Sequence, residues 1–148
     1  MFAPKKILVP TDFSEYSDKA LNKALEIAKQ FNSKIFLLHV NDTIQECAVD
    51  YCVDYNALKK VKEDVVEGTK KRMEAEIAKF LKFENIEVSY DIREGNPIYW
   101  ILREQEEQGV DLIVIGTHGK RGFINQLLGS TSEKVLKGAK CSVLLARD

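Results

Sequence analysis

The sequence predicts an α/β fold, an open sheet of five parallel strands with helices on both faces. Short apolar runs alternate along the chain with longer segments whose apolar residues recur every three or four positions, which indicates strands alternating with helices. The connections between successive strands are long enough for helical crossovers, so we expect the strands to run parallel. Most of the strands are nearly continuous in apolar residues, as expected where helices cover both faces of a sheet.

The composition is that of a globular chain, and we expect one domain over residues 1–148. The chain is 45% hydrophobic and 30% charged, and no apolar run approaches the ~20 residues that span a bilayer. Its 22 basic and 23 acidic residues give a net charge of −1, which argues against nucleic-acid and membrane-surface binding. Three cysteines do not suit a secreted disulfide framework, and the first residues lack a signal-peptide apolar region, so we expect a cytoplasmic location.

The first part of the chain predicts two buried strands with a helix between them. The strands are the apolar runs Lys6–Pro10 and 34–40. One helical face is marked by Ala20, Leu21, Ala24, Leu25, Ala28 and Phe31. Either Ser14 or Ser17 is expected to cap the start of this helix. His39 lies inside the second apolar run, and we expect a hydrogen-bonded core residue rather than a ligand there.

The middle of the chain combines the least regular segment with the longest predicted helix. Residues 41–55 show no clear periodicity and are predicted to form a loop, with room for a helical turn. From residue 56 to about 83 an apolar stripe indicates a helix. The stripe consists of Leu58, Val61, Val65, Met73, Ile77, Phe80 and Leu81. Gly68 interrupts this helix and is expected to weaken it by up to ~1 kcal/mol relative to alanine.

Two further strands flank a short helix. Residues 86–92 alternate between apolar and polar side chains, which indicates a strand at a sheet edge. Pro97 suits the first position of the following helix, which is expected to end near Gly109. Residues 112–115 are wholly apolar and indicate a fourth, buried strand.

The chain closes with a predicted helix and a last apolar strand. The helix is expected from Ser132 to about residue 137, with Gly138 as its C-cap. Residues 142–146 form the strand. An exposed apolar edge strand invites aggregation unless it is paired, so we expect a homodimer joined through Val143 to Ala146.

The stretch from Gly116 to Thr131 has the composition of a phosphate-binding loop. It lies between a buried strand and a helix, and its glycines are Gly116, Gly119, Gly122 and Gly129. Glycines let the backbone approach an anion, and the N–H groups at a helix start point toward it. The spacing fits neither the Walker loop nor the dinucleotide fingerprint, but does fit Gly-x2-Gly-x9-Gly-[Ser/Thr], with Ser130 at its end. The alternative is that these glycines serve only turns and caps.

That loop resembles the nucleotide-binding loop of the universal stress protein family, of the ATP-binding type. The resemblance covers essentially the whole chain. It is carried by residues 7–14, the turn at residues 95–97, the glycine loop with Ser130, and residues 141–145. It implies a Rossmann-like sheet with strand order 3-2-1-4-5, which the periodicity alone does not fix. The carboxyl ends of the first and fourth strands would then be neighbours, where open parallel sheets bind ligands.

The resemblance also implies a ligand, ATP with Mg²⁺ or Mn²⁺. Asp12 would face the adenosine, accepting ribose hydroxyl bonds or contributing to the metal site. Pro10, Thr11 and the backbone near Val40 would line the adenine pocket. The ribose and phosphates would be held by Gly116, Gly119, Gly129, Ser130 and Thr131. The three cationic candidates for the phosphates, which have the alternative of pointing into solvent, are His118, Lys120 and Arg121.

The sequence contains no convincing catalytic constellation, since neither histidine has an evident nucleophile partner and no carboxylate pair stands out. The favoured hypothesis is therefore an ATP-binding regulator or nucleotide-dependent switch of the stress response. It would hydrolyse ATP or autophosphorylate at most slowly, at Ser130 or Thr131. The alternatives are an adenylating or phosphotransfer enzyme on the same scaffold, and a dimeric interaction module that binds no nucleotide.

Overall fold

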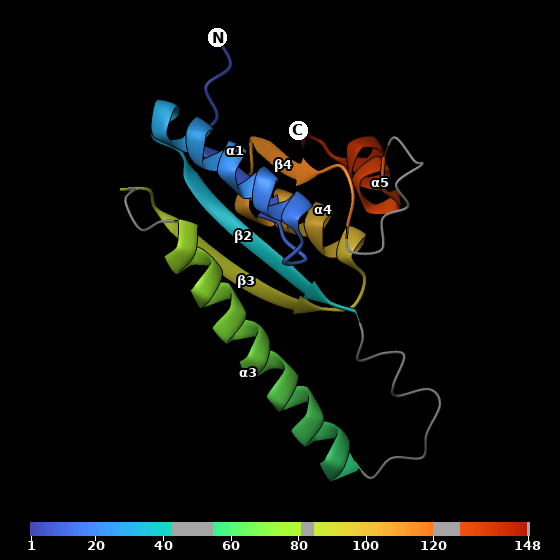
Figure 1. Ribbon diagram of the computed structural model, residues 1–148. Coiled ribbons are helices and arrows are strands. Elements are labelled where there is room, and N and C mark those ends of the chain that lie inside the picture. Colours follow the sequence, from blue (N-terminus) through green and yellow to red (C-terminus); the bar gives the residue numbers. More distant parts are fainter. Residues whose placement is uncertain (43–54, 81–84, 120–127, 148) are drawn as a thin grey trace.

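The computed structural model describes residues 1–42, 55–80, 85–119 and 128–147 (Figure 1). The elements are β1 (Lys6–Pro10), α1 (Glu15–Phe31), β2 (Lys34–Asn41), α3 (Tyr55–Phe80), β3 (Val88–Glu94), α4 (Pro97–Gln108), β4 (Leu112–Gly116), α5 (Ser130–Gly138) and β5 (Ser142–Ala146). Most of the predicted loop at 41–55 lies outside the described residues, as do the predicted helix end at 81–83 and Gly122.

The strands form one sheet in the order β3-β2-β1-β4-β5, and every neighbouring pair is parallel. The predicted fold class and strand order are confirmed. The alternating strand β3 lies at one edge, as its pattern indicated, and β5 lies at the other. The strand order reverses at β1, which has β2 on one side and β4 on the other.

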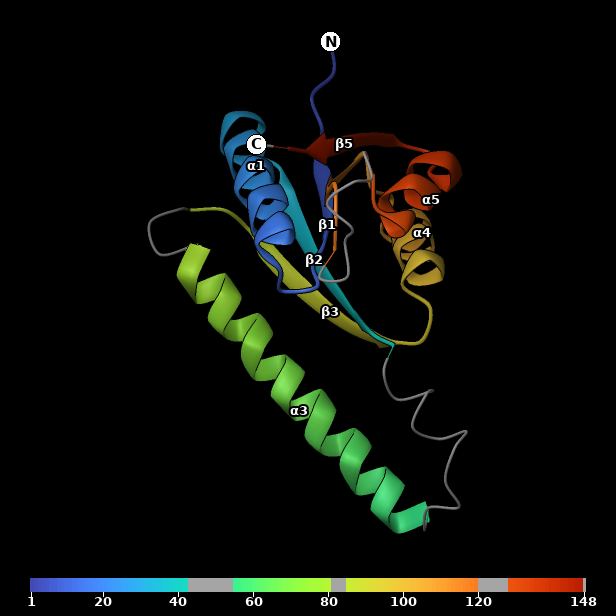
Figure 2. The same ribbon diagram turned by 45° about the vertical axis from the view of Figure 1, so that its right-hand side comes forward.

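The helices form layers on the two faces of the sheet. Figure 2 shows α1 and α3 on one face and α4 and α5 on the other. Side chains alternate between these layers along β1: Ile7 and Val9 pack in the core beneath α1 and α3, and Leu8 in the core beneath α4 and α5. All three residues are at most 1% exposed. The period of two in the strand thus supplies two separate apolar cores.

Two of the predicted helix boundaries are set by local hydrogen bonds. Ser14 is the N-cap of α1, and its side chain accepts a hydrogen bond from the backbone N–H of Ser17. Asn96 caps α4 in the same way, accepting from Tyr99, and Pro97 follows at the first helical position. Gly109 ends α4 with φ of 63°, a left-handed conformation that glycine adopts without strain.

The boundaries of α5 differ from the prediction. The helix begins at Ser130 rather than Ser132, because Gly129 takes the N-cap position and its carbonyl accepts a hydrogen bond from the Glu133 N–H at 3.0 Å. The prediction of Gly138 as the C-cap is wrong, since Gly138 is still helical and Ala139 follows as the cap. A side chain at Gly138 would press on α4: a Cβ atom there would lie 2.8 Å from Cδ1 of Leu102, which would have to move.

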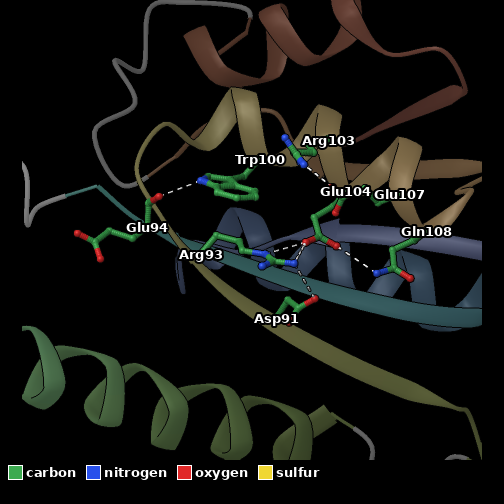
Figure 3. A network of polar contacts seen from close by, with 8 residues as sticks. All are labelled: Asp91, Arg93, Glu94, Trp100, Arg103, Glu104, Glu107 and Gln108. Atoms are coloured by element: carbon green, nitrogen blue, oxygen red, sulfur yellow. Dashed lines mark hydrogen bonds and ion pairs between the residues drawn. The ribbon is translucent and has the colours of Figure 1, made fainter.

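A buried ion pair fixes α4 against the edge strand β3 (Figure 3). Glu104 is 2% exposed, and its Oε1 accepts hydrogen bonds from Arg93 Nε at 2.8 Å and Nη2 at 2.6 Å. The Arg93 guanidinium also lies 5.0 Å from the ring of Trp100, whose indole N–H donates to the Glu94 carbonyl. Trp100 is therefore a half-buried packing residue.

Helix α3 is long but lightly packed. Of its 26 residues, the buried ones are Thr69 and Met73, and the N-terminal end lies well away from the sheet in both views (Figures 1 and 2). Gly68 sits in its exposed middle, with no heavy atom within 4 Å of where a Cβ would be. In the described ranges, no helix is both long and apolar enough to cross a membrane.

Candidate functional site

A cleft of about 950 Å³ opens at the carboxyl ends of β1, β2 and β4, where the strand order reverses. Every predicted site residue in the described part of the chain lines it. These residues are Pro10, Thr11, Asp12, Val40, Gly116, His118, Gly119, Gly129, Ser130 and Thr131. Lys120 and Arg121 lie outside the described residues.

The turn after β1 forms the floor of the cleft through bonds to its own backbone. The Thr11 hydroxyl accepts a hydrogen bond from the Phe13 N–H at 3.1 Å and donates to Ser17 Oγ at 3.1 Å. Oδ1 of Asp12 accepts from the Ser14 N–H at 3.0 Å. Its other carboxylate oxygen lies near Gly119, where a Cβ would come within 2.9 Å of Oδ2. Asp12 therefore lies between the first loop and Gly119 of the glycine-rich loop.

Phe13 is held in a conformation unusual for a bulky residue. Its φ is 62°, in the left-handed region, which costs L-residues roughly 1–2 kcal/mol. Its ring is 4.6 Å from the His39 ring, and the Arg72 guanidinium lies 4.2 Å from its centroid. Phe13, His39 and Arg72 all line the cleft. These aromatic and cation–π contacts offset part of the backbone strain.

Packing constrains the glycines of the second loop to different degrees. Gly116 ends β4 against α1, and a Cβ there would lie 2.7 Å from the backbone oxygen of Tyr16. This glycine is thus demanded by helix–sheet packing, whatever the cleft binds. At Gly129 a Cβ would lie 3.2 Å from the Thr117 carbonyl, which already accepts the Gly129 N–H at 2.6 Å. At Gly119 the obstacle is the carboxylate end of Asp12, which can move, so packing demands a glycine less strictly there.

The start of α5 presents hydroxyl and N–H groups to the cleft. Ser130 is exposed and Thr131 half-buried in the first turn of the helix. The neighbouring Ser132 is buried, and its hydroxyl donates to the Gly116 carbonyl at 2.6 Å, which fixes the helix start to the end of β4. A helix N-terminus held in this way is suited to bind an anion.

The basic side chains that line the cleft, among the described residues, are those of His39, Arg72 and His118. His118 is half-buried, its Nδ1 lies 3.0 Å from the Thr117 hydroxyl, and its ring is 5.4 Å from the ring of Tyr16. Arg72 reaches the cleft from α3, a helix in which the sequence motifs indicated no site residue. Arg72 therefore brings a permanent positive charge to the α3 side of the cleft.

The side of the cleft formed by β2 and α3 was not predicted from the sequence. Asn41 at the end of β2 and Thr69 and Arg72 on α3 line it, together with Phe13. His39 was expected in the core; both of its ring nitrogens are within hydrogen-bond distance of partners, yet it also borders the cleft. Asn41, a polar residue directly after an apolar strand, was the one local indication. Thr69 and Arg72 fit an ordinary helix surface and offered none.

The oxygen atoms in the cleft suit a hard cation beside phosphate groups. Asp12 and Asp42 bring carboxylates, and Ser130 and Thr131 bring hydroxyls. Within the described ranges no group of three or more His, Cys, Asp or Glu residues is placed to hold a metal ion.

Comparison with known proteins identifies the family. A model described as "Universal stress protein family" matches residues 4–147. The chain belongs to the universal stress protein family. It is 39% identical over 145 residues to universal stress protein A homolog 2 of Coxiella burnetii, covering 97% of this chain and 94% of that protein. The solved structure of MJ0577, a universal stress protein of Methanocaldococcus jannaschii, has a TM-score of 0.84 and 31% identity, covering 99% of this chain and 98% of that chain.

Two more distant members of the family share the fold and were solved with nucleotides. A universal stress protein in complex with cAMP has a TM-score of 0.63 and 21% identity, covering 99% of this chain and 98% of that chain. A universal stress protein from Archaeoglobus fulgidus in complex with dAMP has a TM-score of 0.67 and 17% identity, covering 99% of this chain and 100% of that chain. At these identities the likeness establishes the fold alone.

Proposed function

We propose that this universal stress protein binds ATP and acts as a nucleotide-dependent switch or regulator in the stress response. One observation carries the proposal: the Asp12 turn and the glycines Gly116, Gly119 and Gly129 line the same cleft at the reversal of the strand order. The family's complexes with cAMP and dAMP support a nucleotide as the ligand class.

The proposed roles follow the chemistry of each side of the cleft. Pro10, Thr11 and the backbone near Val40 contact adenine, and Asp12 accepts hydrogen bonds from the ribose or contributes to the metal site. Gly116, Gly119, Gly129, Ser130 and Thr131 hold the ribose and phosphates. His118, Lys120 and Arg121 contribute positive charge near the phosphates. Mg²⁺ or Mn²⁺ accompanies the triphosphate, with Asp12 as its nearest protein ligand in this proposal.

We further propose that chemistry at the site is slow. Ser130 and Thr131 line the cleft. In this proposal they are ligands of phosphate first, and their hydroxyls are the candidates for slow autophosphorylation. An adenylating or phosphotransfer enzyme on the same scaffold is the alternative, and it would consume ATP rapidly once an acceptor is present. Measuring ADP and AMP release with and without added protein extracts separates the two.

The proposal includes a homodimer in the cytoplasm. Strand β5 is a sheet edge, and Val143, Leu144 and Leu145 are half-buried along it. Pairing of two copies through Val143 to Ala146 would cover this apolar edge. Light scattering at micromolar concentration is expected to give twice the chain's mass of 16.8 kDa; a monomer would contradict the dimer and favour neither view of the ligand.

Calorimetric titration with ATP and Mg²⁺ tests the nucleotide site. The sharpest variant is Asp12→Asn, because the asparagine Oδ1 can still accept the Ser14 N–H while the charge is lost. Losing a charged hydrogen-bond partner is expected to weaken binding about tenfold or more. Asp91→Asn is the matched control, a carboxylate on β3 outside the cleft, and should bind as the wild type does. No binding by the folded wild type would overturn the proposal and leave the interaction module.

Gly116 is unsuitable as a binding test, although its place in the motif suggests one. A valine side chain there would meet the backbone of Tyr16, so loss of binding could not be separated from loss of the fold. Gly119→Ala is the better choice in this loop, since the methyl group meets only the carboxylate end of Asp12. We expect weaker ATP binding with unchanged unfolding free energy.

A further inference from the structure

Three polar side chains meet on the β2–α3 side of the cleft. His39 Nδ1 lies 2.7 Å from the Thr11 carbonyl oxygen, and its Nε2 lies 3.0 Å from the Asn41 amide Oδ1. The same Oδ1 is 3.3 Å from the Thr69 hydroxyl, which lies 2.8 Å from the Val65 carbonyl. The result is a chain of close polar contacts from β1 through β2 to α3.

Hydrogen-bond donors and acceptors must alternate along this chain of contacts. The Thr11 carbonyl can only accept, so His39 carries a hydrogen on Nδ1. In a neutral imidazole Nε2 is then an acceptor, and an amide oxygen facing it would place two acceptors 3.0 Å apart. The contact is favourable in two states: with His39 doubly protonated, or with the Asn41 amide turned by half a rotation, so that its nitrogen faces His39.

Thr69 distinguishes these two states. Its hydroxyl has one hydrogen, and the Val65 carbonyl at 2.8 Å is the nearer acceptor. With that hydrogen engaged, an amide oxygen 3.3 Å away has no hydrogen from Thr69, whereas an amide nitrogen could donate to the hydroxyl's lone pair. The turned amide thus satisfies both contacts with its two N–H groups.

The outer atom of the Asn41 amide then becomes the group that a ligand meets. Asn41 is 7% exposed and lines the cleft. The outer amide atom of Asn41 is the one that faces away from His39 and Thr69. Among the described residues, the buried side-chain oxygen or nitrogen without a hydrogen bond is Oε1 of Glu76. The outer atom of Asn41 is therefore not sealed in the core. With the nitrogen held by His39 and Thr69, that outer atom is the carbonyl oxygen.

We propose that Asn41 is a specificity-determining residue of the nucleotide cleft: its amide nitrogen donates to His39 and Thr69, and its amide oxygen accepts a hydrogen bond from the ligand. This inference rests on the proposed function. In ATP the matching donors are the amino group of adenine and the two ribose hydroxyls, whereas ionised phosphates offer none. A ligand without the matching donor leaves a buried acceptor unpaired, which is a strong basis for rejection.

The orientation of the amide is tested without any ligand. Nitrogen NMR of the histidine rings at pH 7.5 is expected to show His39 as the neutral tautomer with its hydrogen on Nδ1. Asn41→Asp should change this state to the doubly protonated ring, because a carboxylate can only accept. A doubly protonated His39 in the folded wild type at pH 7.5 would overturn the proposed orientation.

The ligand half is tested by pairing nucleotide analogues with variants. Calorimetry would compare ATP with three analogues, which lack the adenine amino group, the 2′-hydroxyl or the 3′-hydroxyl. We expect one of them to bind the wild type about tenfold more weakly than ATP. In Asn41→Leu the ratio of the two dissociation constants, analogue to ATP, should fall to about one. Asn22→Leu, an exposed position on α1, is the matched control and should keep the wild-type ratio.

Thr69→Val provides a second test in case Asn41→Leu does not fold. It keeps the side-chain shape, removes one of the two groups that hold the amide, and should lower the ratio between ATP and that analogue severalfold. A purely structural role would weaken all nucleotides alike and leave the ratio unchanged. A ratio near one for every analogue in the wild type, or one that persists in Asn41→Leu, would overturn the assignment. If the wild type binds no ATP, both the proposed function and the proposed hydrogen bond from the ligand to Asn41 are overturned. The amide orientation is still decided by the NMR experiment, which needs no ligand.

Discussion

Helices α3 and α4 pack on opposite faces of the sheet beside β3, and both line the cleft, yet they are held in very different ways. Helix α4 has 12 residues, of which Ile101, Glu104 and Gln105 are buried. Helix α3 has 26 residues, of which Thr69 and Met73 are buried. The shorter helix is therefore the more firmly embedded one.

Buried polar contacts account for the position of α4. Glu104 is bound by Arg93 of β3, and Gln105 Oε1 accepts the Lys140 N–H at 3.0 Å, which connects α4 to the segment before β5. Both ends of the helix are capped, by Asn96 and Gly109. A helix whose polar groups find partners at fixed points has one favourable position.

The ion pairs that join α3 to the rest of the fold are largely exposed. Lys79 is 3.5 Å from Asp18, and Lys62 is 3.2 Å from Glu94. Exposed pairs of this kind contribute roughly 0–1 kcal/mol each. Glu76 has a buried oxygen that lacks a hydrogen bond within the described residues. One side of the cleft is therefore specified by buried pairing. The other rests on a few core contacts and on the polar contacts of Asn41 with His39 and Thr69.

The largest effect is expected from breaking the buried pair of α4. Arg93→Met keeps the apolar stem but leaves the Glu104 carboxylate buried without its cation, and removing one partner of a buried pair costs about 3–5 kcal/mol. Urea denaturation should show a loss of unfolding free energy near the lower end of that range, because the Arg93 side chain is itself 34% exposed.

Arg103→Met is the matched control on the same helix. Arg103 pairs with Glu107 at 2.6 Å, but both side chains are exposed, so the loss should stay below about 1 kcal/mol. Equal losses in the two variants would show that the buried pair does not hold α4, and the contrast between the helices would lose its main support.

A smaller, pH-dependent effect is expected on α3. Burial raises the pKa of Glu76 to about 7, helped by a hydrogen bond with Asp18 and by that residue's charge, while Lys79 and Arg72 act in the opposite direction. Because the pKa is raised in the folded state, the folded protein holds a proton that the unfolded chain releases. The unfolding free energy contributed by this group is therefore fully present at pH 4 and lost as the pH rises through 7.

Glu76→Gln copies the protonated side chain and tests this dependence. The variant should become more stable relative to wild type between pH 5 and pH 8, by roughly 1 kcal/mol, since water screens a partly exposed carboxylate and reduces the full linkage value. At pH 8, hydrogen exchange should be slower in α3 of the variant and unchanged in α4. If the unfolding free energies of wild type and Glu76→Gln change in parallel between pH 5 and pH 8, Glu76 does not make the stability of α3 depend on pH.

Much of this molecule could be predicted from local patterns. Apolar runs and helical stripes located every described element, and the strand order followed from the family resemblance. The Asp12 turn and the glycine loop marked one side of the cleft, because each is continuous in sequence. Gly116 shows a limit of such motifs: the residue was expected to bind ligand, but the backbone of Tyr16 alone would demand glycine there.

The side of the cleft formed by β2 and α3 has no such pattern. Asn41 and Thr69 are separated by 28 positions and meet through the packing of α3 on the sheet. Thr69 and Arg72 look like ordinary polar residues of a helix surface, and their value depends on which face of α3 turns toward β2. The orientation of α3 is set by the packing of Met73 in the core, not by any short motif.

The smallest predicted effect compares two glycine-to-alanine changes that probe the surroundings of the two helices. Gly68→Ala on α3 introduces a methyl group with no heavy atom within 4 Å, so the higher helix propensity of alanine should stabilise the protein by up to ~1 kcal/mol. Gly138→Ala on α5 also favours a helix, but its methyl group would lie 2.8 Å from Leu102 Cδ1 on α4, and Leu102 must shift. Denaturation midpoints should therefore rise for the first variant and stay level or fall for the second. A rise in the midpoint for both variants would mean that the α4–α5 contact accommodates a methyl group as easily as the open surface of α3 does. The two sides of the cleft would then differ less in rigidity than their contacts indicate.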